Sequence, residues 1–177
     1  MEARATDIAG NLCGFGKMGT LIRKARIGEE DAIHDAHMRS IREVCVHDHG
    51  EEEIRGWGYR ERGNRFEEGV REGLVWVVEH DQKIEGLASM MLKKDSAYIH
   101  CLYLTPPVLG KGFGKHLLQL MIQKTKEANL REILLESSIT AHKFYRAFGF
   151  VDTSPVKQVV IGGYPVRCIP MKYTLSS

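Results

Sequence analysis

Two long stretches of the chain carry apolar residues three and four positions apart, which is the spacing of an amphipathic helix. The first begins at the acidic residues 29–31, and the residues that recur at this spacing are Ile33, Ala36, His37, Ile41 and Val44. The second ends near residue 129, and its apolar positions are Phe113, Leu117, Leu120, Met121 and Ala128. Acidic residues at the start of the first stretch suit the positive end of a helix dipole. Shorter helices are predicted at 51–57 and 140–148.

Runs rich in β-branched and aromatic residues predict strands. These runs cover 20–25, 74–79, 84–92, 97–104, 132–138, 156–161 and 165–175. Turn residues at 81–83 and 94–96 join three of them into an antiparallel meander, and Gly162-Gly163 joins the last two into a hairpin. The stretch 69–73 begins and ends with glycine and is predicted to be a break.

The order of these elements predicts one mixed α/β domain over residues 20–177. Helices come first and the meander follows. The second long helix then connects two strands that would be parallel across a right-handed crossover if they share a sheet. A length of 177 residues suits a single core. Residues 1–19 are rich in Gly and Ala, lack clear periodicity, and are predicted to form a loose leader.

Composition and charge exclude several classes of partner. The chain is 43% hydrophobic and 27% charged, with a formal net charge of +2, so no overall field favours nucleic acid or a membrane surface. No stretch reaches the roughly 18 apolar residues of a membrane span. Cys13, Cys45, Cys101 and Cys168 are scattered, which argues against a disulfide framework and a zinc site. A reducing, cytoplasmic location fits this pattern.

A glycine-rich turn stands between the strand at 97–104 and the second long helix. Backbone N–H groups at a helix start are unsatisfied, and Gly110, Gly112 and Gly114, followed by Lys115, would let a diphosphate approach them. The offsets match neither a P-loop, which would need glycine at Leu109, nor a dinucleotide fingerprint, which from Gly110 would need glycine at Lys115.

The turn Leu109-Gly110-Lys111-Gly112-Phe113-Gly114 resembles the Gln/Arg-x-x-Gly-x-Gly/Ala turn of the GNAT acetyltransferase superfamily, which holds the pyrophosphate of acetyl-coenzyme A. Residues 137–150 resemble the family's second coenzyme segment, a short helix that carries a Phe-Tyr pair and ends in Gly-Phe. Order and separation also match. The chain is therefore identified as a GNAT member over 20–175. The resemblance implies the GNAT fold, an N-acetyltransferase activity, and acetyl-CoA as co-substrate.

The resemblance also implies where the coenzyme binds. Backbone N–H groups of 109–114 would hold the pyrophosphate, helped by the charge of Lys111 or Lys115. The pantetheine would lie along the strand edge at 102–104, with the N–H of Leu104 as donor to the acetyl carbonyl. The residues expected to bind the coenzyme are Leu102, Leu104, Leu109, Gly110, Lys111, Gly112, Phe113, Gly114, Lys115, Ser138 and Tyr145.

Two of these positions depart from the family pattern. Leu109 replaces the usual Gln or Arg, so any side-chain contact from that position is lost while backbone binding survives. Ser138 stands where many relatives have Asn, which leaves it as a candidate cap of the next helix.

Tyr145 matches the family's tyrosine, so the resemblance implies that it gives a proton to the coenzyme sulfur. Taken from the residues alone, Tyr145 could equally belong to an aromatic core patch with Phe144, Phe148 and Phe150.

His100 is the candidate general base, because an imidazole with a pKa near 6.5 can take a proton at neutral pH. Tyr98 and a water chain are the alternatives for that task, and a structural role is the alternative for His100. Strict strand alternation would place Tyr98, His100 and Leu102 on one face and Ile99, Cys101 and Tyr103 on the other.

In relatives the first pair of helices lines the acceptor pocket, which implies substrate contacts from His37, Asp48, Glu52 and Trp57. Solvated surface and core packing are the alternatives for these residues. The acidic ones would suit a cationic amine, and a small molecule is favoured over a protein as acceptor. The histidines lack partners at accepted zinc spacing, so no metal site is predicted.

The expected reaction is direct transfer of acetyl to an amine in a ternary complex. A non-catalytic coenzyme-binding sensor is the rival, and the departures at Leu109 and Ser138 favour it. Covalent transfer through Cys101 is a third reading, disfavoured by its expected orientation away from His100. The sequence leaves the acceptor and the oligomeric state open, a homodimer included.

Overall fold

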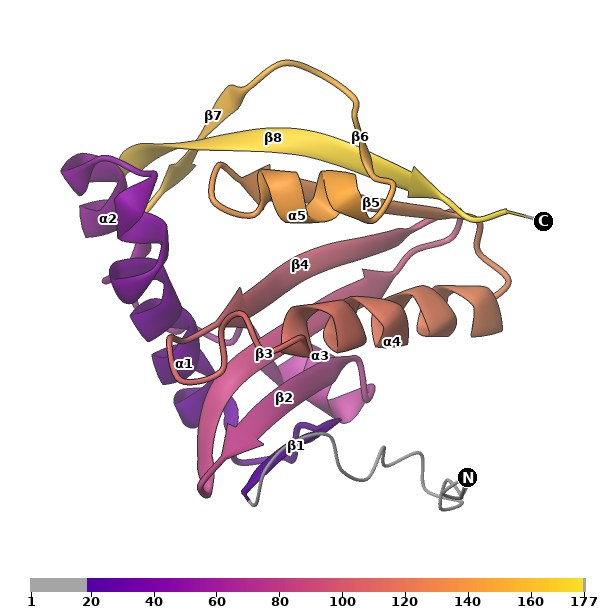
Figure 1. The fold of residues 1–177 in the computed structure, drawn as a ribbon, viewed down its shortest axis with the longest axis horizontal. Helices are drawn as coiled ribbons and strands as arrows, with labels where there is room; N and C mark the ends of the chain where they lie inside the picture. The colour runs from indigo at the N-terminus through magenta and orange to yellow at the C-terminus, as the bar shows by residue number, and fades with distance from the viewer. Residues whose placement is uncertain (1–18, 177) are drawn as a thin grey trace.

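The computed structural model describes residues 19–176, so the expected leader at 1–19 lies outside the described residues except for Gly19. The chain forms a mixed sheet with the strand order β1-β2-β3-β4-β5-β8-β6, and β7 pairs with β8 (Figure 1). The strands are β1 (Thr20–Lys24), β2 (Val75–His80), β3 (Lys83–Leu92), β4 (Ala97–Leu104), β5 (Glu132–Ser138), β6 (Val151–Asp152), β7 (Lys157–Ile161) and β8 (Tyr164–Thr174). The helices are α1 (Glu30–Glu43), α2 (Glu51–Trp57), α3 (Glu67–Arg71), α4 (Phe113–Glu127) and α5 (His142–Ala147).

The predicted connections are confirmed. Strands β2, β3 and β4 form the antiparallel meander, and β4 and β5 are parallel neighbours joined through α4. Strands β7 and β8 form the terminal hairpin, in which β8 also pairs antiparallel with β5. The mixed α/β fold class predicted from the element order is therefore correct.

The predicted break at 69–73 is wrong in part, because Glu67–Arg71 forms the short helix α3. Packing outweighs the poor helix propensity of glycine here, since Phe66 and Val70 are buried in the core. A Cβ at Gly69 would lie 3.0 Å from the Val75 side chain, which is closer than an ordinary contact, so glycine suits this approach of α3 to β2. The two-residue strand β6 was also not predicted.

Two apolar clusters cover the two faces of the sheet. Helices α4 and α5 pack on one face through residues that include Leu117, Met121 and Tyr145. Helices α1 and α3 pack on the other through Ile33 and Val70. Figure 1 shows α4 and α5 lying along the sheet, with α1 and α2 gathered at one end of it. In the part of the chain that the structure describes, no helix is long and apolar enough to cross a membrane.

Strand β4 contains a β-bulge at His100. Its pairing with β3 moves from Ile99↔Met90 to Cys101↔Ser89, which leaves His100 as an extra residue. Ile99 therefore packs in the cluster under α4 while Cys101 packs in the opposite cluster. The predicted division of residues 98–103 between two faces is wrong beyond His100, because a bulge reverses the face that each later residue occupies.

Strands β4 and β5 diverge after a short paired segment. Their pairs run from Ala97↔Ile133 to Ile99↔Leu135, and the described residues beyond Ile99 form no further pair between them. Each diverging half stays attached to its other neighbour, β4 to β3 as far as Leu104 and β5 to β8 as far as Ser138. Figure 1 shows β4 and the β5–β8 pair separating toward α1 and α2. The sheet thus opens at its centre without losing a strand.

Candidate active site

Three adjacent cavities occupy the opening between β4 and β5, and Tyr103 and Ser138 line all three. The turn-side cavity, of about 160 Å³, is bounded by the glycine turn, α5 and the end of α1. The α2-side cavity, of about 180 Å³, is bounded by α1, α2, β7 and β8. A narrow central cavity of about 20 Å³ joins their linings and contains Tyr145 and His100.

The turn-side cavity is lined mainly by apolar groups. Its lining residues are Ser40, Val44, Cys45, Leu102, Tyr103, Leu104, Leu109, Gly114, Ser138, Thr140, Ala141 and Phe144. Of the residues expected to bind the coenzyme, Leu102, Leu104, Leu109, Gly114 and Ser138 therefore meet in one place. A slender, partly apolar chain such as pantetheine suits this lining.

The glycine turn leaves its backbone open to an anion. Gly110 and Gly112 have φ values of 73° and 89°, which glycine adopts without strain, and both are exposed. Among the described residues, none accepts a hydrogen bond from the N–H groups of Gly110 to Lys115. These groups stand at the N-terminus of the 15-residue helix α4, whose dipole adds to their attraction for an anion.

The side chains of this turn contribute less than its backbone. Phe113 is buried in the core under α4, and Lys115 is exposed. The Nζ of Lys111 donates to the carbonyl oxygen of Pro107 at 2.6 Å, so this side chain folds back on its own turn. Neither lysine lines any of the three cavities.

Buried polar contacts fix the first residues of the turn. The Thr105 hydroxyl donates to the carboxylate and to the carbonyl oxygen of Glu85, and Leu109 donates its N–H to the Thr105 carbonyl at 3.0 Å. Glu85 is the extra residue of a second bulge, in β3, and Arg39 of α1 pairs with its carboxylate. The turn is therefore anchored to both β3 and α1.

The edge of β4 presents backbone groups to the opening. Thr105 donates its N–H to the Glu85 carbonyl on β3 at 2.9 Å. Because successive N–H groups of a strand point to opposite edges, the N–H of Leu104 points away from β3. The Ser40 hydroxyl donates to the Leu104 carbonyl at 2.8 Å, so α1 holds this edge in position.

Tyr145 lines the central cavity and is only 5% exposed. Its ring also packs against Phe144 and Phe150, with 5.3 Å between ring centroids in each pair. The two readings of Tyr145 are therefore compatible, because the same residue belongs to the aromatic patch and to the cavity wall. Burial raises the pKa of Tyr145, with a smaller contribution from Cys101, so its hydroxyl keeps its proton at neutral pH.

His100 lines both the central and the α2-side cavities. Its ring lies 4.9 Å from that of Tyr98, between centroids. The side chain reaches solvent, yet partial burial and the nearby Lys93 lower its pKa, which leaves the imidazole neutral at pH 7. Burial raises the pKa of Tyr98 to about 12, so Tyr98 is the poorer base of the two.

Ser138 caps the turn before α5. Its Oγ accepts a hydrogen bond from the N–H of Ala141 at 3.2 Å, which holds this turn, whereas the N-cap of α5 is Ala141 and the helix has no side-chain cap.

Two of the four residues expected at the acceptor line the α2-side cavity, namely His37 and Trp57. His37 is buried against the Tyr103 ring, 4.2 Å between centroids, and burial lowers its pKa far below the usual value. Asp48 and Glu52 are exposed and lie outside the linings of the three cavities.

The inward acid of α2 is Glu53, one residue further along. It is 8% exposed and forms an ion pair with Arg167 at 2.8 Å. The sequence could have indicated that Glu53 points inward, because Glu53 is four residues before Trp57 and the two therefore share one face of the helix.

Sequence reasoning missed three charged residues of the α2-side cavity: Arg60, Glu136 and Arg167. Arg60 follows α2 in a loop, where no periodicity indicates which way a side chain points. Glu136 and Arg167 face the cavity because β5 and β8 diverge from β4, and the divergence left no mark in the pattern of apolar residues.

Other candidate chemistry receives little support. Among residues 19–176, no three His, Cys, Asp or Glu side chains are grouped to hold a metal ion. Burial raises the pKa of Cys101, so its thiol stays protonated and is a poor nucleophile.

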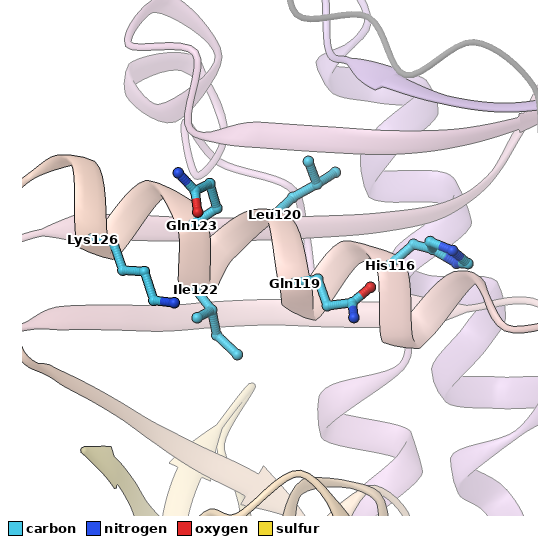
Figure 2. A pocket seen from close by; sticks show the side chains of 6 residues that line it. All are labelled: His116, Gln119, Leu120, Ile122, Gln123 and Lys126. Carbon is cyan, nitrogen blue, oxygen red and sulfur yellow. The ribbon is translucent and has the colours of Figure 1, made fainter. Parts of the chain in front are cut away.

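A separate hollow of about 360 Å³ lies along α4, and Figure 2 shows that all six side chains lining it come from this helix, between His116 and Lys126. None of the six lines the opening between β4 and β5.

A family model for the acetyltransferase (GNAT) domain matches residues 45–175. The match covers most of the chain and includes both β4 and the glycine turn. The chain therefore belongs to the GNAT acetyltransferase family. A search of curated proteins found no match to this sequence.

Solved structures with the same fold share little sequence with this chain. A GCN5-related N-acetyltransferase structure from Rhodopseudomonas palustris superposes with a TM-score of 0.72 at 17% identity, covering 92% of this chain and 99% of that one. The PaiA N-acetyltransferase of Thermoplasma acidophilum, in complex with coenzyme A, gives 0.68 at 20% identity, covering 89% and 99%. Naa50 of Arabidopsis thaliana, in complex with the bisubstrate analogue CoA-Ac-MVNAL, gives 0.62 at 18% identity, covering 88% and 99%. These likenesses concern the fold.

Proposed function

We propose that this protein is an N-acetyltransferase that transfers acetyl from acetyl-CoA to an amine by direct attack in a ternary complex. The observation that carries the proposal is the opening between β4 and β5, which three adjacent cavities occupy. It has unsatisfied backbone N–H groups at one end, Tyr145 in the middle and a polar cavity at the other end. Family membership and the coenzyme complexes of two solved relatives support acetyl-CoA as the donor.

Each part of the donor has a place in this opening. The pyrophosphate would bind the N–H groups of Gly110 to Lys115 at the start of α4. The pantetheine would follow the edge of β4 through the turn-side cavity. The N–H of Leu104 points toward this space and would donate to the thioester carbonyl, where negative charge develops during attack.

Tyr145 and His100 both line the central cavity, and they would serve as acid and base there. The amine nitrogen attacks the thioester carbon, a C–N bond forms and the C–S bond breaks. His100 would take a proton from the amine, directly or through water, and its lowered pKa keeps it ready to accept one at pH 7. Tyr145 would give its proton to the leaving thiolate, which its raised pKa allows because the hydroxyl is protonated.

Direct attack is favoured over an acetylated enzyme. Cys101 lines the central cavity together with His100, but burial raises its pKa and keeps the thiol protonated, so an acetyl-cysteine intermediate has little support. Cys45, Cys101 and Cys168 are free thiols, in line with the expected reducing, cytoplasmic location, which stays a prediction.

The experiment is release of the coenzyme thiol from acetyl-CoA with a panel of amines, followed by mass spectrometry of the acetylated product. Calorimetric titration with acetyl-CoA runs beside it. Binding together with amine-dependent thiol release supports the enzyme. Binding without turnover on any amine supports the rival, a coenzyme-binding sensor, and absence of binding removes the coenzyme site from the proposal.

A further inference from the structure

Among the described residues, no carboxylate pairs with Arg60, an arginine that lines the α2-side cavity. Nη2 of Arg60 lies 3.5 Å from Nε2 of His37, at the limit of a hydrogen bond. Its Nε is buried and has no hydrogen-bond partner among the described residues. Arg60 therefore brings a positive charge and free donors to the cavity wall.

The other charges of this cavity are already compensated. Arg167 forms an ion pair with Glu53 at 2.8 Å, and Glu136 pairs with Lys157 of β7. His37 is neutral, since burial holds its pKa far below the usual value. Arg60 is thus the one guanidinium among the described residues of the lining whose charge is left without an acid.

Holding an unpaired cation partly out of water costs free energy, and a ligand of opposite charge can offset that cost. Burial lowers the pKa of Arg60, and the charge of nearby Arg65 lowers it further, so a guanidinium in this place is less stable than one in water. A carboxylate would accept from the planar guanidinium through two oxygens at once, the geometry that arginine provides and lysine does not.

We propose that the acceptor amine also carries a carboxylate, which Arg60 binds, so that the substrate class is a free amino acid. This inference rests on the proposed acetyltransferase function. Arg60 and His100 line the same cavity, and His100 also lines the central cavity with Tyr145. An amino acid whose carboxylate meets Arg60 would therefore direct its amine toward the central cavity and the thioester.

The size of the cavity agrees with this class of acceptor. About 180 Å³ accommodates a small molecule and not a folded protein surface. Asp48 and Glu52, the acids expected to attract a cationic amine, lie outside the lining. The charge available to an incoming ligand is therefore positive.

The test compares amino acids with their own carboxamides. Each pair has the same side chain and amine, and only the carboxamide lacks the negative charge. We expect the wild-type enzyme to acetylate the best amino acid with a kcat/KM at least tenfold above that of its carboxamide. Arg60→Gln should abolish this preference by raising KM for the acid, and Arg60→Lys should restore part of it.

Arg65→Gln is the matched control. It removes the same charge from an exposed residue outside the cavity lining, so the preference should persist. Equal rates on acids and carboxamides, or an unchanged preference in Arg60→Gln, would overturn the inference while leaving acetyl transfer in place.

If no amine is acetylated, a direct measurement of amino-acid binding tests whether Arg60 forms a carboxylate site. Calorimetry on the wild type and on Arg60→Gln, each saturated with coenzyme A, would measure affinity for the amino acids themselves. Binding of an acid that Arg60→Gln loses supports the carboxylate site even where the proposed transfer fails. Absence of any such binding overturns the inference.

Discussion

Tyr145 combines the two environments that a proton donor requires. Its ring is held between Phe144 and Phe150, and it lines the central cavity, where we propose that its hydroxyl serves as the acid. A fixed ring and a protonated hydroxyl are what general acid catalysis asks of a tyrosine.

Replacing Tyr145 with Phe should therefore lower kcat while leaving the affinity for acetyl-CoA within about twofold. General acids contribute on the order of 100-fold or more to rate, which sets the scale of the loss. Steady-state kinetics and calorimetry measure the two quantities. Tyr173→Phe removes a hydroxyl from a residue of the same aromatic patch outside the cavity linings and should change neither. An equal loss of rate and coenzyme affinity in Tyr145→Phe would contradict the acid role.

The proposed pyrophosphate site can be tested by replacing Gly112, which lies in the glycine turn, and using Gly28, which lies outside it, as the matched control. Their φ values are 89° and 95°. A Cβ added at Gly112 would lie 4.0 Å from the His116 ring, and one added at Gly28 would have nothing within 4 Å. Changing either to Leu should cost about 1 kcal/mol of stability through backbone strain. Only Gly112→Leu should also weaken acetyl-CoA binding, by at least tenfold in Kd. Equal coenzyme affinity in both variants would show that the turn does not hold the diphosphate.

At the scale of elements, an ion pair between the buried Glu53 and the half-exposed Arg167 joins α2 to β8. Glu53 of α2 accepts hydrogen bonds from the backbone N–H and the guanidinium of Arg167. Burial alone would raise the pKa of Glu53, but the bonds from Arg167 and the N–H of Gly50 outweigh it and lower this pKa to about 2. This pair helps set the wall of the α2-side cavity.

The stability that Glu53 contributes should depend on pH in a defined direction. Its folded pKa lies below its unfolded value, so the contribution, about 2 to 3 kcal/mol, is present above roughly pH 5 and is lost as pH falls toward 2. We expect the difference in unfolding free energy between wild type and Glu53→Gln to shrink to less than about half by pH 3. Urea unfolding from pH 7 to pH 3 measures it.

Glu52→Gln is the control for that series, because Glu52 is exposed on the same helix and its replacement should stay within about 0.5 kcal/mol of wild type. A difference between wild type and Glu53→Gln that stays constant with pH would contradict the lowered pKa.

At the scale of the whole molecule, the sheet links both walls of the opening. Strand β4 belongs to the meander and β5 to the β5–β8 pair, yet the two are joined over residues 97–99 and 133–135. One sheet with one continuous set of strands suggests that residues 20–177 unfold together, which is the single domain predicted from the sequence.

Thermal unfolding should accordingly show one transition, and acetyl-CoA should move all of it. At an acetyl-CoA concentration 100 times its Kd, binding adds about 2.7 kcal/mol to the free energy of unfolding. This corresponds to a rise of roughly 5 to 10 °C in Tm for a protein of this length. Differential scanning calorimetry with and without acetyl-CoA measures the shift. Two transitions, of which only one moves, would mean that the two walls belong to separate units.

The sequence by itself determined the type and order of the elements. Strand alternation and helical periodicity depend on neighbours along the chain, so the meander, the crossover helix α4 and the terminal hairpin were predicted within a few residues. The sequence also indicated the glycine turn, because the positive φ of Gly110 and Gly112 is a property of the local backbone that favours glycine.

Only the tertiary structure decided how those elements diverge and which charges meet. The bulge at His100 reversed the faces beyond it, and the separation of β5 from β4 created the cavities. Arg60, Glu136 and Arg167 come together from a loop and two strands, across distances in sequence that no periodicity spans. Charge compensation depends on three-dimensional neighbours, and for this reason the free guanidinium of Arg60 is visible only in the folded chain.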